Sequence, residues 1–114
     1  MKTSELTGAA LDWAVAKCDG SEIFFDKYDE TYKFFDREEG GERDWKPSTD
    51  WAQGGPIIGR EKITVRFWVD EPFVHAYKWN TEDWLEGPTP LIAAMRCYVA
   101  SKLGDEIELP KELT

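Results

Sequence analysis

Residues 87–104 read GPTPLIAAMRCYVASKLG, and this stretch decides the fold because it encodes a helix together with both of its ends. Thr89 can cap the first free backbone N–H groups, and Pro90 stands at the first helical position, where its missing N–H costs nothing. Gly104 can adopt the left-handed conformation that ends a helix. The apolar run from Leu91 to Leu103 therefore predicts a capped helix in the core.

A second helix is predicted at the other end of the chain, from about Thr3 to Cys18. A repeat at helical spacing runs through Leu6, Ala10, Trp13, Ala14 and Lys17, and Leu11, Val15 and Cys18 widen its apolar face. The pair Asp19-Gly20 is a typical helix stop and predicts where this helix ends.

Four strands are predicted between the two helices. The aromatic-rich runs 23–25 and 32–35 flank a polar turn, which is typical of a hairpin. The run 63–69 alternates and the run 73–79 returns after a turn, so these two predict an antiparallel pair. The face of the first run that should be buried comprises Ile63, Val65, Phe67 and Val69.

The remaining segments are predicted to connect these elements. Residues 36–46 indicate a variable, mobile acidic loop, residues 80–86 a polar connection, and residues 105–110 a short tail along the sheet. The predicted class is α+β: residues 1–114 form a two-layer single domain, with the N- and C-terminal helices packed on one small antiparallel sheet.

Composition narrows the function classes. The chain of 114 residues has no apolar run long enough to span a membrane and no secretion signal, so we expect a cytoplasmic protein without a membrane partner. Of the net charge of −9, residues 19–50 carry −6 and residues 105–114 carry −3. Binding to a nucleic-acid backbone needs clustered Lys and Arg, so a direct nucleic-acid partner is not expected.

Catalytic and metal chemistry have little support in the sequence. With two Cys and one His, a zinc site is not expected, and Cys18 and Cys97 are predicted to be buried, reduced thiols. His75 is predicted to be a sheet-face histidine with a structural partner, the alternative being a general base. Residues 54–60 fail as a phosphate loop because Arg60 replaces the lysine and Pro56 removes an N–H. We therefore expect no enzyme and no cofactor.

A ligand site is predicted where glycine and proline precede a helix start. This occurs at Gly54-Gly55-Pro56, after a capped turn at residues 47–53, and again at Gly87-Pro88-Thr89-Pro90. Pro56 would open a second short helix, and free N–H groups at helix starts attract anions. Trp84 could add a stacking ring. The predicted ligand-binding residues are Thr49, Trp51, Gln53, Gly54, Gly55, Thr89 and Arg96. In the alternative interpretation, these are turn formers, caps and core aromatics, with Arg96 in a structural ion pair.

The acidic segment allows two interpretations. It is either a solvated surface or an imitation of a nucleic-acid backbone that binds a basic groove on a host enzyme. The acidic pairs 29–30, 38–39 and 105–106 are compatible with mimicry, but five Lys and Arg residues interrupt the run 19–50. An exposed aromatic hairpin near Phe24 and Phe34 would also be compatible with a homo-oligomer.

Three blocks of the chain resemble the NinX-like family of small proteins from tailed temperate phages and their prophages. They are residues 1–6 through 11–16, residues 47–58 with the sequence PSTDWAQGGPII, and residues 87–104 continuing to Pro110. Residues 21–46 lie outside the resemblance, and the family favours Asn and Glu where this chain has Asp50 and Gly59. The resemblance implies an accessory protein in the bacterial cytoplasm, and it brings no established activity and no catalytic residues.

Together these observations predict a non-enzymatic phage accessory protein. Its expected partner is a small anionic or nucleotide-like ligand. This ligand would be a host signalling molecule, which the protein would sequester by binding it. In the alternative, the partner is a host protein. The chain would then be an acidic interaction module that inhibits or modulates a host nucleic-acid enzyme.

Overall fold

A computed structural model describes residues 1–79 and 84–114, and it confirms the α+β class. The predicted single sheet is replaced by two three-stranded antiparallel sheets. The three helices are α1 (Gly8–Asp19), α2 (Trp51–Glu61) and α3 (Pro90–Leu103). The lower sheet has the order β1 (Phe24–Asp26), β2 (Thr31–Phe35), β3 (Glu42–Asp44). The upper sheet has the order β4 (Ile63–Phe67), β5 (Val74–Lys78), β6 (Leu85–Gly87).

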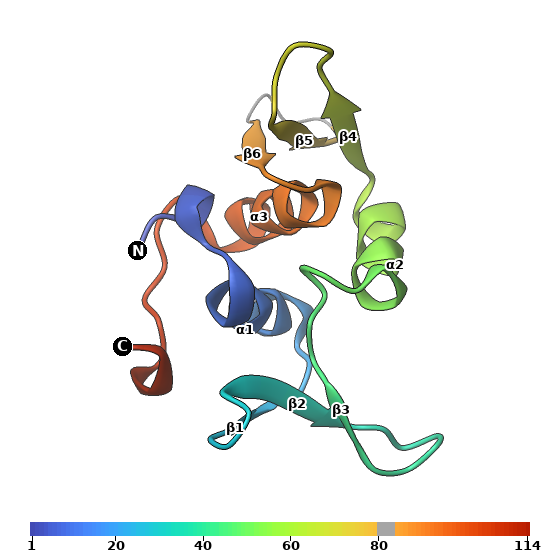
Figure 1. The fold of residues 1–114 in the computed structure, drawn as a ribbon, viewed down its shortest axis with the longest axis vertical. Coiled ribbons are helices and arrows are strands. Elements are labelled where there is room, and N and C mark those ends of the chain that lie inside the picture. Colours follow the sequence, from blue (N-terminus) through green and yellow to red (C-terminus); the bar gives the residue numbers. More distant parts are fainter. Residues whose placement is uncertain (80–83) are drawn as a thin grey trace.

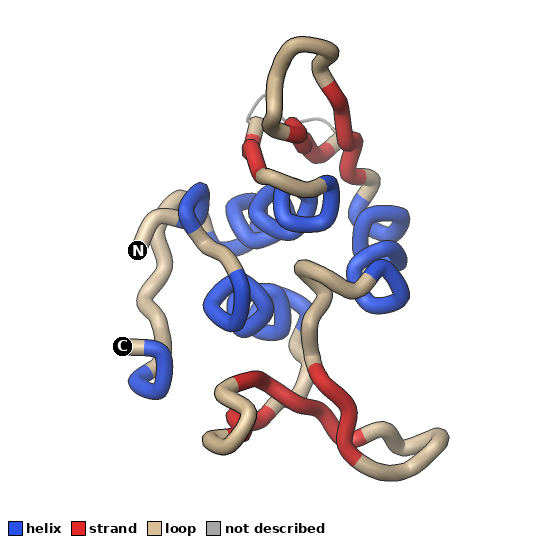
Figure 2. Tube along the Cα trace, viewed as in Figure 1, coloured by secondary structure: helices blue, strands red, loops and turns tan. Residues whose placement is uncertain are grey.

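Helices occupy the middle of the molecule and the two sheets lie at opposite ends (Figures 1 and 2). The upper sheet covers one side of α3, α1 packs against the other side, and the lower sheet lies beyond α1 (Figure 1). The molecule measures 41 × 31 × 25 Å, and its long axis follows this stacking. The two sheets do not share strands because α1 and α3 lie between them.

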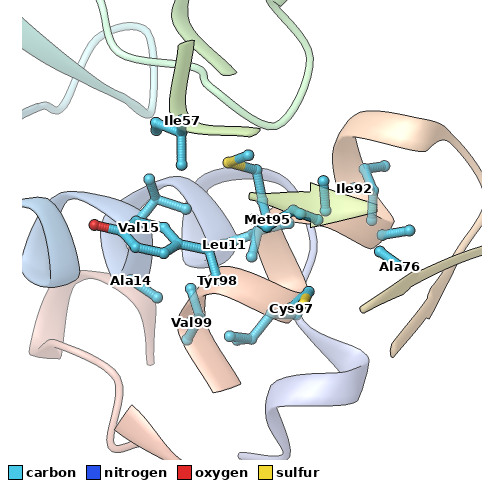
Figure 3. Close-up of a cluster of buried hydrophobic side chains, with 14 of the residues drawn as sticks. Leu11, Ala14, Val15, Ile57, Ala76, Ile92, Met95, Cys97, Tyr98 and Val99 are labelled. Atoms are coloured by element: carbon cyan, nitrogen blue, oxygen red, sulfur yellow. The ribbon is translucent and has the colours of Figure 1, made fainter. Parts of the chain in front are cut away.

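The helix α3 has the ends that its sequence encodes. The Thr89 side chain accepts a hydrogen bond from the Ile92 N–H at 3.1 Å, Pro90 is the first helical residue, and Gly104 ends the helix with a φ of +87°. The helix body is buried on all sides, through Leu91, Ile92, Ala93, Ala94, Met95, Cys97, Tyr98 and Val99. Figure 3 shows Met95, Tyr98 and Val99 facing Leu11 and Val15 of α1, with Ile57 of α2 closing the cluster.

The N-terminal helix starts later than the sequence predicts. A 3-10 turn spans Thr3–Glu5, and α1 begins only at Gly8, which has a φ of +56°. The Thr3 hydroxyl donates to the Gly104 carbonyl at 2.6 Å, so the first residues are tied to the far end of the chain instead of extending α1. The C-terminal tail also departs from its predicted course: Ile107 N–H donates to the Met1 carbonyl, so the tail lies beside the N-terminus (Figure 1).

The segment Gly54-Gly55-Pro56 lies inside one helix and starts none, so the predicted second helix start is wrong. The helix α2 begins after Asp50, whose side chain accepts from the Ala52 N–H at 2.9 Å, and continues through Pro56 to Glu61. Packing overrides the weak local propensity, since Ile57 is buried in the core. A Cβ on Gly54 would lie 2.3 Å from the Pro47 carbonyl oxygen, so this glycine serves close packing.

Two strand predictions need correction at their edges. The predicted loop 36–46 contains β3, which pairs antiparallel with β2. In β4 the expected buried face holds for the first half of the strand: Ile63 is 7% exposed and Val65 packs partly buried against the core, whereas Phe67 is 69% exposed. The end of the β4–β5 hairpin projects past α3 (Figure 1), and Phe67 and Val69 near this end are exposed. The predicted connection 80–86 lies partly outside the described residues, and its last two residues belong to β6.

Asp12 is a buried carboxylate that joins α1 to the segment before α2. Its side chain accepts from the Ser48 N–H at 2.9 Å, and its backbone carbonyl accepts from the Trp45 indole N–H at 2.8 Å. Burial raises the pKa of Asp12 from 3.8 to about 6, against the smaller opposing effect of the Ser48 hydrogen bonds. Folding therefore disfavours the ionised form of Asp12 relative to its state in the unfolded chain.

The packing of Gly54 predicts a large loss of stability in Gly54→Ala. The new methyl group would also approach Leu91 Cδ2 to 2.7 Å, so we expect the free energy of unfolding to fall by about 2–3 kcal/mol. Gly59→Ala is the matched control in the same helix, because a Cβ there meets nothing within 4 Å. It should raise stability by up to about 1 kcal/mol. Equal effects in urea unfolding would contradict this packing.

The raised pKa of Asp12 predicts a pH-dependent benefit of Asp12→Asn. In the wild type, the favourable contribution of the protonated carboxyl is complete below about pH 4 and is lost as the pH rises through about 6. Asparagine keeps the acceptor for Ser48 but carries no charge. Between pH 4 and pH 7.5, the unfolding free energy of the variant relative to wild type should rise by about 2–3 kcal/mol. Asp105→Asn controls for loss of a surface charge, and a pH-independent difference for Asp12→Asn would contradict the assignment.

Candidate functional site

An open cavity of about 800 Å³ lies at the junction of the upper sheet, α3 and the N-terminal segment. We call it the aromatic cavity. Among the described residues, its main lining side chains are Trp68, Phe73, His75, Trp84, Glu86 and Arg96, and Ser4, Leu85 and Pro88 also line it. Its volume is within the range of small-molecule sites in proteins.

Arg96 is the cation of the aromatic cavity, and the fold holds it firmly. It projects from the middle of α3, where its Nε donates to the Leu6 carbonyl at 2.8 Å and its Nη1 donates to the Glu86 carbonyl at 2.7 Å. Neither acceptor carries a charge. Among the described residues, no carboxylate lies within 4.0 Å of its guanidinium, and burial lowers its pKa. The predicted structural ion pair of Arg96 is therefore not found in the described part of the chain.

Aromatic rings form the wall of the cavity on the outer face of the upper sheet. The His75 ring makes edge contacts with Trp68 and Trp84, with centroid distances of 6.0 and 5.7 Å. Trp84 also contacts Tyr77 at 4.9 Å. The His75 Nε2 lies 2.8 Å from a Glu71 carboxylate oxygen, so His75 has the structural partner predicted for it. This contact fixes the ring at the centre of the aromatic wall.

The other predicted site residues do not join Arg96. Among the described residues that line the aromatic cavity, none comes from the range 49–55. Gln53 accepts from the Lys46 N–H and donates to the Asp44 carbonyl, so its side chain fixes the segment before α2. Trp51 is 58% exposed at the start of α2, and Thr49 is exposed beside it.

Gly54, Gly55 and Thr89 have packing or capping contacts. Gly54 is buried against Pro47 and Leu91, and Gly55 lies near the Trp51 ring. The Thr89 hydroxyl caps α3. Of the two glycine-proline segments, only Gly87–Pro90 reaches the aromatic cavity, through Pro88. The structure thus brings together Arg96, Trp84 and Pro88, and separates them from the α2 part of the predicted site.

The upper sheet, with its β4–β5 hairpin, contributes Trp68, His75 and Glu86, which are not among the predicted ligand-binding residues. Strand register places His75 opposite both Arg66 and Glu86, so these side chains share the outer face of the sheet. Trp68 follows Arg66 by two residues, and the Arg66 guanidinium lies 5.3 Å from its ring. Alternation in the runs 63–69 and 73–79 could have grouped Trp68 with His75, since both occupy the polar face of the hairpin.

The two cysteines lie away from the aromatic cavity. Both are free thiols: Cys97 is buried in the core as predicted, whereas Cys18, also predicted to be buried, is only half-buried against the core. Burial raises the pKa of each thiol from 9.0 to about 11, so both are protonated at neutral pH. Within residues 1–79 and 84–114, no group of three His, Cys, Asp or Glu side chains is arranged to hold a metal ion. No helix in the same residues has the length and apolar character needed to cross a membrane.

The acidic residues of the lower sheet are partly neutralised by their own strands. Lys33 pairs with Asp29 at 2.7 Å and with Asp26 at 3.3 Å. Arg43 pairs with Asp36 at 2.7 Å and also contacts Glu39. Two of the five basic residues that interrupt the acidic run, Lys33 and Arg43, therefore form ion pairs with acidic residues of this part of the chain. The aromatic hairpin is only partly exposed, because Phe34 packs edge-on against Trp45.

The model of the family described as bacteriophage P22 NinX matches residues 2–102, which include α1, α2, both sheets and all of α3 except its last residue. The chain belongs to the NinX family. No curated protein matches the chain. The match covers Arg96 and the described side chains of the aromatic wall, so the aromatic cavity is built from residues inside the family region.

Proposed function

We propose that this NinX-family protein is a non-enzymatic phage accessory protein that binds a small anionic, nucleotide-like ligand in the aromatic cavity. In this proposal it acts in the cytoplasm of the bacterial host and sequesters a host signalling molecule. The observation that carries the proposal is the placement of Arg96, a partly buried cation beside a wall of aromatic rings.

Arg96 supports the anionic part of the ligand. A guanidinium has five N–H donors in a planar arrangement, and two of its nitrogens already donate to the carbonyls of Leu6 and Glu86. Those bonds fix the orientation of the group without neutralising its charge. A phosphate or carboxylate at the remaining N–H groups would supply a counter-charge that no described carboxylate provides within 4.0 Å, and such charge-assisted hydrogen bonds are the strong ones.

The aromatic wall supports the flat part of the ligand. Trp84 is 45% exposed, Trp68 is 46% exposed and Phe73 is 48% exposed, so each ring has surface left to cover. Stacking of a nucleobase on an aromatic side chain is worth about 1–3 kcal/mol. A ring bound here would lie next to Arg96, which also lines the cavity. The thiols of Cys18 and Cys97 are protonated, so neither is an activated nucleophile, and this agrees with a role in binding without catalysis.

The direct test is calorimetric titration with mononucleotides and bacterial cyclic dinucleotides. Arg96→Gln should weaken binding of the ligand by at least about tenfold, the loss expected for a hydrogen bond between charged groups. Arg37→Gln is the matched control, since it removes one positive charge from the exposed turn between β2 and β3. Circular dichroism checks that both variants are folded. Absence of binding by every nucleotide, or equal binding by folded Arg96→Gln, would contradict the proposal.

A second candidate is the acidic interaction module, favoured by the concentration of charge on the lower sheet. Residues 19–50 carry −6 and include a sheet that projects from the helices (Figure 1). In this case the host target is a nucleic-acid enzyme whose basic groove the sheet would occupy. Since Asp26, Asp36 and Glu39 already have basic partners, the exposed Glu38 and Glu42 are the better residues to test.

This candidate predicts salt-sensitive retention of a nucleic-acid enzyme from host lysate. Duplex DNA should compete for the retained enzyme, and Glu38→Gln with Glu42→Gln should release it at lower salt. The control pair Glu5→Gln and Glu108→Gln removes the same charge from other exposed positions. If the enzyme is still retained at high salt and duplex DNA does not compete for it, mimicry of a nucleic-acid backbone is excluded.

A further inference from the structure

The aromatic cavity contains charges of both signs that do not pair with each other. Glu86 lines the cavity together with Arg96, yet no ion pair joins their side chains within 4.0 Å among the described residues. The Arg96 guanidinium instead binds the backbone carbonyl of Glu86. The Glu86 side chain lies on the outer face of β6, opposite His75 in the register. A ligand in the cavity would therefore contact the Arg96 guanidinium and the Glu86 carboxylate as two separate groups.

The Glu86 carboxylate is open to a ligand. Its side chain is 58% exposed, and its Oε1 lies 3.7 Å from the His75 Nε2, beyond hydrogen-bond distance. The same nitrogen is already within 2.8 Å of Glu71. Because Glu71 occupies the histidine, the two Glu86 oxygens can accept hydrogen bonds from a molecule in the cavity. Trp84 precedes Glu86 by two residues, so an aromatic ring stands next to this acceptor.

Guanine is the nucleobase whose edge matches this arrangement. An ionised carboxylate only accepts hydrogen bonds, and its two oxygens suit two adjacent donors. Guanine presents a ring N1–H beside a 2-amino group, whereas hypoxanthine has only the ring N–H and adenine has only an amino group beside a ring acceptor. We propose that the aromatic cavity selects guanine nucleotides, with Glu86 accepting from N1–H and the 2-amino group and Arg96 binding the phosphate. This inference rests on the proposed nucleotide-binding function and names the base.

The test compares the affinities of 5′-GMP, 5′-IMP and 5′-AMP by calorimetry. GMP and IMP differ only in the 2-amino group, so wild-type protein should bind GMP at least about tenfold more tightly than IMP. Glu86→Gln should lower the ratio of GMP affinity to IMP affinity to within about threefold of one, because its amide keeps one oxygen for the N1–H of either base and loses the second acceptor for the 2-amino group. Circular dichroism checks that the variant is folded. Glu108→Gln, at an exposed position outside the cavity, is the matched control and should keep the preference for GMP.

The outcomes separate the two proposals. Equal affinities of wild type for GMP and IMP, or a GMP preference that survives Glu86→Gln, would overturn the assignment of guanine and leave nucleotide binding in place. Absence of binding by all three nucleotides and by the cyclic dinucleotides would overturn the proposed function itself. If Glu86→Gln does not fold, the ratio of the two wild-type affinities still decides between guanine and any other base.

Discussion

The burial of α3 on every side is the constraint on which the rest of the structure depends. A helix that is apolar all round has to be covered from several directions. Here β5 and β6 cover one side, α1 covers another, and α2 closes the cluster through Ile57 (Figure 3). This requirement explains why the chain separates its strands into two sheets: the upper sheet packs on α3, and the lower sheet packs on α1 (Figure 1).

Features that are encoded locally could be predicted from the sequence. The ends of α3 follow from Thr89, Pro90 and Gly104, because a cap, a first-turn proline and a terminal glycine act within a few residues. The same holds for the β1–β2 and β4–β5 hairpins, whose strands are joined by short turns.

Features that depend on distant contacts could not be predicted in this way. Gly54 and Pro56 are poor helix residues, but α2 continues through them because Ile57 enters the core and Gly54 packs on Leu91. The late start of α1 has a similar origin, since the bond from Thr3 to Gly104 joins opposite ends of the chain. The aromatic cavity is such a feature as well. The place of Arg96 on a capped helix predicts its role in a ligand site. The other side chains of the cavity come mainly from a sheet whose register a single sequence does not give.

The position of Arg96 makes the stability of the fold and the chemistry of the cavity depend on the same bonds. Its two hydrogen bonds join α3 to the N-terminal segment at Leu6 and to β6 at Glu86. The fixed guanidinium donates to both carbonyls and keeps further N–H groups for a ligand. Burial of a charge costs free energy, as the lowered pKa of Arg96 reflects, and no described carboxylate lies within 4.0 Å of this guanidinium. An anion bound in the cavity would recover that cost, so ligand binding would stabilise the junction of the three segments that form the site.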